Sequence, residues 1–380
     1  MESFLKAQRG SHVNGISELK TYLHRFGYLL PENANFSDAF DATFESAILH
    51  FQSKLGLSLS GKLDFDTMSQ ISAPRCGVPD TISTFTLHGT RHYMYFPGKP
   101  RWARRMPMKL TYAFSPDYTI RYLSSSEIKA VFKRAFARWA SVIPVSFVET
   151  EDYVYADIKI GFYHGEHGDS EPFDGVLGVL AHSFSPENGK VHLDAAETWA
   201  VDFRSEKSAV AMDLESVATH EIGHLLGLAH SSVKEAVMYP TLKPREKKLD
   251  LQLDDIEGVQ ALYGSNPNFN IGSLSESDIS TNQAVNVLRK STRSSILAIA
   301  STMTPKSSSH REGLSTSTVR SDPSSTIEAS WTTSSGADSV IRDIDEFMDE
   351  VRADSDSVDR MVKGDDDDDC VDITTVGGPV

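Results

Sequence analysis

Residues 220–230 read His-Glu-Ile-Gly-His-Leu-Leu-Gly-Leu-Ala-His, and the rest of the chain is best interpreted outward from them. His220 and His224 are four residues apart, so in a helix both imidazoles project from one face and can share a metal ion. Gly227 lets the chain leave the helix in a left-handed conformation, which can return His230 as a third ligand. Three neutral imidazoles leave one position open on a tetrahedral zinc, which is typical of catalytic sites.

Glu221 directly follows the first histidine, where its carboxylate can reach a water on the metal. The short pattern His-Glu-x-x-His is expected by chance in roughly one chain in a hundred, and the extended pattern is about a thousandfold rarer. The alternative is a buried helix with incidental histidines, which does not explain polar side chains at all these positions together. The stretch therefore predicts a zinc hydrolase with Glu221 as general base.

Net charge, cysteine count and the lack of long apolar stretches exclude several classes of protein. The chain has 380 residues and a formal net charge of -16, which argues against a nucleic-acid-binding protein. Its two cysteines, Cys76 and Cys370, are too few for a disulfide framework. No secretory signal is visible at the N-terminus, no hydrophobic tail for a lipid anchor at the C-terminus, and no stretch reaches the roughly 18–20 apolar residues of a membrane span.

The sequence predicts two folded units and a tail. Residues 1–80 predict a small all-α unit, because apolar residues recur at helical spacing. Residues 81–105 are expected to be a linker, polar and exposed over its first part. Residues 106–268 mix strand-like and helical patterns, which predicts an α+β domain. Residues 269–380 are rich in Ser, Thr and Asp and poor in aromatic residues, so we expect them to be disordered.

The α+β prediction rests on local patterns within 106–268. Strand-like runs lie at 110–114, 145–148, 157–162, 179–184 and 190–193. Helical spacing of apolar residues follows Ser124, crosses the histidine stretch and recurs over 253–263. Together these patterns predict five strands and three helices in one unit.

Val237-Met238-Tyr239-Pro240 follows the histidines after a short loop. A methionine in a tight turn usually fills a core and alone would carry no functional meaning. Placed just after three zinc-ligand histidines, Met238 matches the Met-turn of the metzincins, in which a methionine packs beneath the ligands. The sequence therefore resembles that clan.

Residues 74–80, Pro-Arg-Cys-Gly-Val-Pro-Asp, form a segment that we call the switch segment. A thiolate is a soft zinc ligand, so Cys76 could occupy the open fourth position; the alternative is a buried structural cysteine. The segment looks like the cysteine switch of matrix metalloproteinase zymogens. In that interpretation Arg75 and Asp80 pair and hold the shape of the loop.

A second group of metal-ligand residue types lies between 164 and 197. His167, Asp169, His182 and His192 suffice for a closed tetrahedral structural zinc. Any one of these residues alone would be taken for a surface residue, but together they resemble the structural zinc and calcium loop of the matrixins. The calcium ligands that this resemblance implies are Asp174, Gly175, Leu177, Val179, Asp194 and Glu197. His164 does not fit the pattern and is expected at the surface.

Residues 15–264 as a whole resemble a matrix metalloproteinase of the matrixin family, as a prodomain followed by a catalytic domain. The resemblance implies a metzincin domain with a mixed five-stranded sheet and three helices. It also implies an all-α prodomain similar to a peptidoglycan-binding module. The absence of a hemopexin-like propeller, together with Phe96-Pro97-Gly98 and residues 262–268, points to the plant-type group.

The resemblance also implies a function and partners. It implies a latent zinc endopeptidase that cleaves extracellular or cell-wall-associated proteins after prodomain removal, with two zinc ions, one of them structural, and calcium. Ala181, Pro240 and Leu242 are the implied substrate-binding residues. Partners would be protein or peptide substrates, an activating protease and protein inhibitors, at a secreted location. The alternatives are another metzincin endopeptidase, a catalytically silent metal-stabilised binding module and a cell-wall-binding protein.

Three features depart from the family pattern, and one of them is the missing secretory signal. Asp157 would contribute to a second calcium site, but the loop between His182 and His192 that would complete it is shorter than in many animal matrixins. Leu242 stands where the family often has a tyrosine, which predicts a more apolar rim of the specificity pocket.

Overall fold

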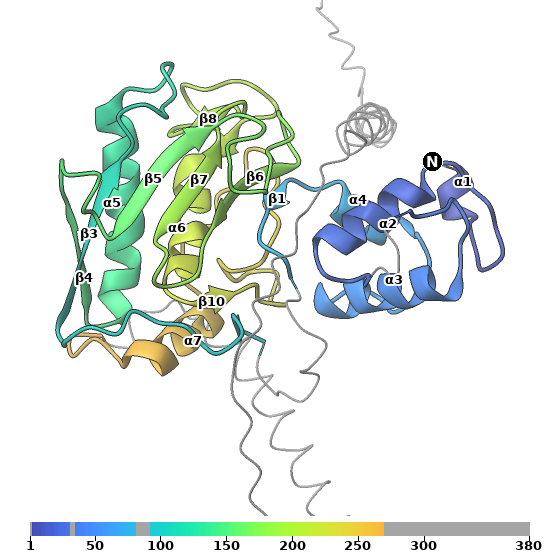
Figure 1. Cartoon of the computed structure of the whole chain (residues 1–380), viewed down its shortest axis with the longest axis horizontal. Helices are drawn as coiled ribbons and strands as arrows, with labels where there is room; N and C mark the ends of the chain where they lie inside the picture. Colours follow the sequence, from blue (N-terminus) through green and yellow to red (C-terminus); the bar gives the residue numbers. More distant parts are fainter. Residues whose placement is uncertain (1, 31–34, 81–91, 270–380) are drawn as a thin grey trace, which may run out of the picture.

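The computed structural model describes residues 2–30, 35–80 and 92–269, and all structural statements concern these residues. They form a helical unit, up to residue 80, beside an α+β unit that starts at residue 92 (Figure 1). The predicted tail beyond Phe269 and the first part of the predicted linker lie outside the described residues. Within the described ranges, no helix is both long enough and apolar enough to cross a membrane.

The helical unit contains four helices: α1 Glu2–Leu5, α2 Ile16–Arg25, α3 Ala42–Lys54 and α4 Phe65–Ile71. Asp41 and Asp64 begin α3 and α4 by accepting hydrogen bonds from the backbone N–H groups of Phe44 (2.8 Å) and Thr67 (2.9 Å). Apolar residues at helical spacing, such as Phe44 and Phe51, are fully buried between the helices. The predicted all-α unit is thus confirmed.

One mixed sheet forms the α+β unit. Its strands are β3 Met108–Phe114, β4 Val145–Glu149, β5 Ile158–Tyr163, β6 Val179–Ser183 and β7 Lys190–Asp194. The strand order is β1-β6-β7-β5-β3-β4, and all neighbours are parallel except β6 and β7. The five predicted strands are confirmed. A sixth edge strand, β1 Arg75–Cys76, comes from the switch segment.

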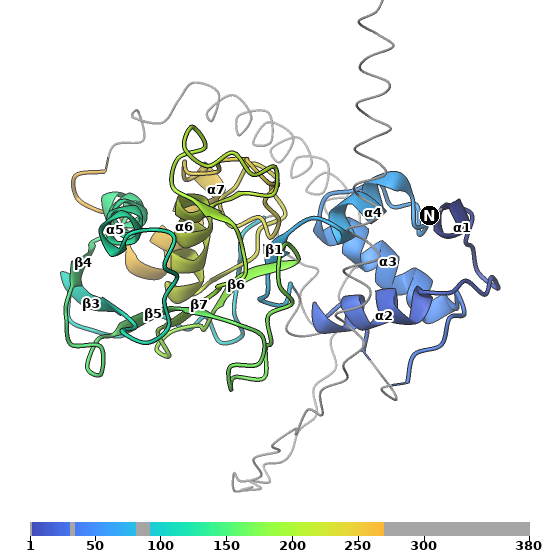
Figure 2. The same ribbon diagram turned by 90° about the horizontal axis from the view of Figure 1, so that it is seen from above.

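Three helices accompany the sheet, as predicted: α5 Ser125–Val142, α6 Leu214–Leu225 and α7 Leu253–Tyr263. Figure 2 shows α5 and α6 side by side on one face of the sheet, where they pack together. Trp139 of α5 is fully buried, and its indole N–H donates to the carbonyl of Thr219 in α6 at 2.8 Å. A short parallel pair, β8 Trp199–Ala200 and β9 Met212–Asp213, leads into α6.

Helix α6 carries the first two histidines and ends where the sequence predicts. Asp213 caps its N-terminus by accepting from the backbone N–H of Ser216 at 2.9 Å. Gly227 has a φ of 100°, and a Cβ there would lie 2.2 Å from the carbonyl oxygen of Pro100. Only glycine fits this turn, which leads the chain into β10 Leu228–Ala229 and on to His230.

The described part of the expected linker, residues 92–105, is exposed at most positions but is held against the α+β unit by its aromatic side chains. Met94–Tyr95 forms β2, which pairs antiparallel with β10, and Tyr93 is buried. The Tyr95 hydroxyl donates to the carbonyl of Gly258 at 2.9 Å, and the Trp102 indole donates to that of Leu225 at 2.8 Å. The expected exposure is found at residues 97–99, whereas Tyr93 is buried and Tyr95 is half-buried against the α+β unit.

Candidate active site

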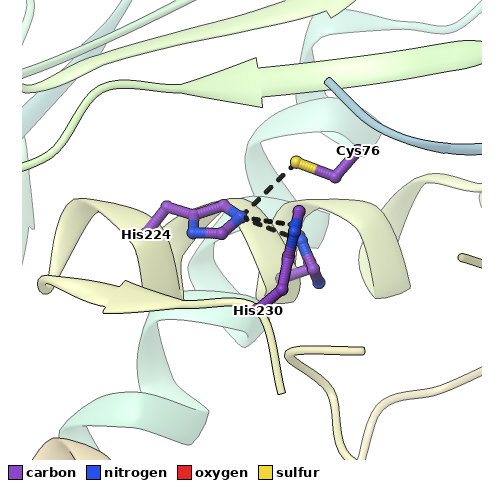
Figure 3. Close-up of side chains that lie close together, drawn as sticks. Cys76, His224 and His230 are labelled. Carbon is purple, nitrogen blue, oxygen red and sulfur yellow. Dashed lines mark hydrogen bonds between the residues drawn. The ribbon is translucent and has the colours of Figure 1, made fainter. Parts of the chain in front are cut away.

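Three ring nitrogens converge at the end of α6. His224 Nε2 lies 3.0 Å from His220 Nε2 and 3.2 Å from His230 Nε2, and all three side chains are buried. The fourth atom is the Cys76 sulfur, 3.4 Å from His224 Nε2. Figure 3 shows the sulfur and the imidazoles facing one another. The structure therefore brings together four residues that the sequence assigns to one metal.

The other nitrogen of each ring fixes its tautomer. Nδ1 of His220 and of His224 lies against the backbone carbonyls of Val237 (2.7 Å) and Leu228 (2.8 Å), and Nδ1 of His230 against an Asp80 carboxylate oxygen (2.6 Å). These oxygens only accept, so each Nδ1 donates its proton. Burial lowers the pKa of all three imidazoles, which keeps them neutral. Each Nε2 therefore presents a lone pair to the others.

This arrangement fits a zinc ion. Unprotonated nitrogens about 3 Å apart repel each other unless a cation lies between them. A tetrahedral zinc with Zn–N distances of about 2.0–2.1 Å would hold two such nitrogens about 3.3 Å apart, and a thiolate sulfur about 3.5 Å from each. The observed separations of 3.0, 3.2 and 3.4 Å are close to these values.

Glu221 lies in the same buried region. Its side chain is fully buried, and burial raises the pKa of its carboxyl to about 7. The side chains of Ser183 and Cys76 offset part of this increase in pKa. A carboxylate with a pKa near neutrality is suited to accept and return a proton. Burial and the neighbouring Glu221 also raise the pKa of the Cys76 thiol, so a thiolate at this place requires a cation beside it.

The Met-turn lies beneath the ligands. Met238 is buried, and a Cβ at Gly223, between the two helical histidines, would lie 2.2 Å from the Met238 sulfur. The turn is held by Asp255, whose carboxylate accepts from the backbone N–H groups of Val237 (2.9 Å) and Met238 (3.0 Å). Asp255 was not predicted to belong to the site, because an acidic residue in the first turn of a helix is commonly explained by the helix dipole alone.

The switch segment fills the cleft between two walls. On one side, the N–H groups of Arg75 and Gly77 donate to the carbonyls of Gly178 (2.7 Å) and Ala181 (2.8 Å) along β6. On the other side, the N–H of Cys76 donates to the carbonyl of Pro240 at 2.9 Å. These bonds place the sulfur over the histidines and occupy the edge of β6.

A buried ion pair holds the switch segment. The Arg75 guanidinium makes two 2.8 Å contacts with the Asp80 carboxylate and lies 3.5 Å from the centre of the Phe26 ring. Asp80 also accepts from the Tyr28 hydroxyl and from His230 Nδ1, both at 2.6 Å. The arginine and histidine contacts lower the pKa of Asp80 despite its burial. Asp80 thus connects Tyr28 of the helical unit with His230 of the α+β unit. No sequence pattern indicated this connection.

Replacing this carboxylate is expected to loosen the switch segment. Asp80→Asn leaves the buried Arg75 without its counter-charge, which should destabilise the full-length chain by about 3–5 kcal/mol. The free energy of unfolding in urea measures the effect. Asp66→Asn, at an exposed position in α4, is the matched control and should change that free energy by less than about 0.5 kcal/mol. Equal stabilities of the two variants would contradict this role of Asp80.

The second histidine group also converges. One Asp169 oxygen lies 2.9 Å from His167 Nε2, 2.8 Å from His182 Nε2 and 2.7 Å from His192 Nδ1. These four atoms form the second set of metal-ligand atoms found among the described residues. Four protein ligands complete a tetrahedral shell, so the chemistry suits a structural zinc. His164 is exposed and outside the group, as expected.

The predicted calcium ligands lie close by but are less converged. Asp194 and Glu197 are buried, and Asp194 accepts from the backbone N–H of Gly175 at 3.1 Å. Burial, with a smaller contribution from the neighbouring Asp174, raises the pKa of Asp194 to about 6. The positive φ of Leu177, 65°, and of its glycine neighbours bends the intervening loop, which leads into Val179 at the start of β6. Buried carboxylates of this kind suit a bound cation, although within the described ranges they do not form a third tight ligand group.

Asp157 has a different role from the one expected. One of its oxygens accepts from the Arg104 guanidinium at 2.5 Å. The other accepts from the backbone N–H and the hydroxyl of Thr111 at 2.8 and 2.9 Å. Both oxygens thus anchor β3 and the segment before it. The second calcium site at Asp157 is not supported, because an arginine already supplies the positive charge.

A cavity, which we call the inner cavity, extends from the histidines into the α+β unit. Its lining includes Cys76 and Glu221 of the site, Pro240 and Leu242 after the Met-turn, and Ser216 and Lys248. Two of the three predicted substrate-binding residues therefore line it. Ala181 instead contributes the backbone carbonyl that Gly77 now occupies. The arrangement is that of a metzincin metalloendopeptidase, with an apolar side-chain pocket beside a three-histidine site.

Comparison with known proteins gives the same class. The matrixin family matches residues 101–264, and a peptidoglycan binding domain family matches residues 12–71. The chain is similar to metalloendoproteinase 4-MMP of Arabidopsis thaliana, with 62% identity over 71% of this chain and 78% of that protein. Metalloendoproteinase 1-MMP of the same organism is 58% identical over 71% of this chain and 75% of that protein. Matrix metalloproteinase-20 of Homo sapiens is 42% identical over 57% of this chain and 41% of that protein. The chain belongs to the matrixin family of zinc metalloendopeptidases.

Proposed function

We propose that this chain is a latent endopeptidase that cleaves internal peptide bonds of extracellular or cell-wall-associated proteins once the switch segment has left the cleft. The observation that carries the proposal is the Cys76 sulfur, 3.4 Å from His224 Nε2, at the position that three histidines leave open. An activating protease would release the segment, and protein inhibitors would compete for the same cleft.

The residues of the site have separate roles in this proposal. His220, His224 and His230 hold the catalytic zinc, which supplies Lewis acidity and lowers the pKa of a bound water. Glu221 accepts the proton of the attacking water and delivers it to the leaving amine. The carbonyl of Ala181, freed from Gly77, accepts a backbone hydrogen bond from an extended substrate.

The inner cavity receives the side chain that follows the scissile bond. Pro240 and Leu242 give it an apolar wall, so an aliphatic residue is the preferred occupant. Cleavage of a peptide library by the activated chain, mapped by mass spectrometry with and without a zinc chelator, tests this function. Chelator-sensitive cleavage before aliphatic residues supports it, and the absence of any chelator-sensitive product contradicts it.

Two further metal sites belong to the proposal. His167, Asp169, His182 and His192 hold a structural zinc, and Asp174, Asp194 and Glu197 with nearby carbonyls hold calcium. Both would fasten the long loop that precedes β6, the strand along which substrate lies. Their function is therefore to keep one wall of the cleft in place.

The structural zinc can be tested by removing one ligand. His167→Ala is expected to reduce the zinc content of the purified chain from two equivalents to one, because three ligands no longer close the shell. Atomic absorption measures the zinc, and the melting temperature should fall with it. His164→Ala, three residues away at an exposed position, is the matched control and should keep both equivalents. Two full equivalents in His167→Ala would rule out this site.

A further inference from the structure

Lys248 separates the inner cavity from a second cavity on the outer surface. This outer cavity is lined by Gln70 of the helical unit and by a lysine-rich part of the α+β unit that includes Lys234 and Lys243. Three residues line both cavities and so form the wall between them: Tyr239, Thr241 and Lys248.

The contacts of Lys248 show that its side chain crosses this wall. Its backbone N–H donates to the Ser216 hydroxyl at 2.8 Å, and Ser216 lines the inner cavity only. Its ammonium donates to the carbonyl of Lys234 at 2.8 Å, and Lys234 lines the outer cavity only. The aliphatic stem therefore lies between the hydrogen bond to Ser216 and the hydrogen bond to Lys234. Burial lowers the pKa of the ammonium, as expected for a side chain enclosed along most of its length.

The other two wall residues depend on the helical unit. The Tyr239 hydroxyl donates to the carbonyl of Leu55 and to the side chain of Gln70, both at 3.2 Å. The Thr241 hydroxyl donates to Gln70 at 3.3 Å. These bonds are lost when the helical unit leaves. Both bonds of Lys248 described above are made within the α+β unit, so they persist in the active enzyme.

We propose that the aliphatic stem of Lys248 closes the far end of the specificity pocket and thereby limits the length of the side chain that can follow the scissile bond. The inference rests on the proposed function, because it assigns the inner cavity to that side chain. We expect a leucine-sized side chain to be accommodated in front of the stem. A long aryl side chain meets the stem and can enter only if Lys248 gives up its bond to Lys234. Lys248 is therefore a specificity-determining residue that does not touch the reacting atoms.

The test compares two quenched peptides that differ only at the residue after the cleavage site, leucine in one and 4-phenylphenylalanine in the other. The full-length chain is activated with an organomercurial thiol reagent, and kcat/KM is measured for both. Lys248→Ala should raise the aryl-to-leucine ratio of kcat/KM at least about tenfold, the lower end of what one methylene decides in a closed pocket. Lys248→Met keeps the length of the stem without its charge and should leave the ratio within about twofold of the wild-type value. Lys243→Ala, which lines only the outer cavity, should also leave it unchanged.

Two results would overturn the proposal. One is an unchanged ratio in Lys248→Ala; the other is an increase in Lys248→Met as large as in Lys248→Ala, which would assign the effect to charge. If Lys248→Ala does not fold, Lys248→Ser carries the same expectation. Failure of the proposed function is recognised separately, because the activated wild-type chain would then leave the leucine peptide uncleaved.

Discussion

Replacing Glu221 with glutamine is expected to reduce kcat/KM of the activated chain by about 10²–10⁴-fold, the contribution of a positioned general base. The substitution preserves the size of the side chain and removes its ability to take a proton. Because Glu221 is not among the converging ligands, the zinc content should stay at the wild-type value. Cleavage of a quenched peptide and atomic absorption measure the two quantities on the same sample.

The control for this experiment is Glu257→Gln, at an exposed position of α7, which should cleave at the wild-type rate. A Glu221→Gln variant as active as the wild-type chain would exclude the proposed base. Full zinc content with lost activity is the combination that assigns Glu221 to proton transfer, and it also argues against a catalytically silent metal-stabilised module.

Replacing Cys76 with serine is expected to remove latency. A neutral hydroxyl is a much poorer zinc ligand than a thiolate, while the backbone hydrogen bonds of the switch segment to β6 and Pro240 remain. Breaking a buried charge pair costs at least about 3 kcal/mol of free energy. If the loss of the sulfur–zinc contact destabilises the closed form by that amount, the population with an open cleft rises about 100-fold. The rate of peptide cleavage by the untreated chain should rise in proportion.

Cys370→Ser provides the comparison, since it removes the other cysteine and should leave the untreated chain inactive. Persistent latency in Cys76→Ser would assign the block to the backbone of the switch segment and not to the sulfur. Asp80→Asn is expected to act in the same direction as Cys76→Ser, because it weakens the ion pair that holds the same segment.

Features that depend on local chemistry could be predicted from the sequence. Helix α7 begins and ends at the predicted residues, since its apolar spacing and the acidic residues in its first turn are local signals. The bend at Gly227 was predictable for the same reason, because a positive φ has a strong residue preference. The histidines at 220, 224 and 230 were recognised from their spacing, whereas the second set, His167, Asp169, His182 and His192, was assigned to zinc through the resemblance to the matrixins.

Features that depend on distant neighbours could not be predicted. Asp80 and His230 are 150 positions apart, and nothing near either residue indicates their hydrogen bond. Strands β1 and β2 have two residues each, too short for a periodic pattern, and both exist only because another strand lies beside them. Asp157 was considered for a second calcium site because of the family pattern, and its contact with Arg104, 53 positions away, could not be foreseen. Lys248 carried no motif, and its role depends on two cavities that exist only in the folded chain.

Latency and the zinc site are tested together by the rate at which the full-length chain cleaves a quenched peptide before and after an organomercurial thiol reagent is added. We expect no cleavage by the untreated chain, cleavage after the reagent has captured Cys76, and loss of that cleavage when a zinc chelator is added. Full activity without the reagent would contradict latency. Activity that survives the chelator would contradict the zinc site at His220, His224 and His230.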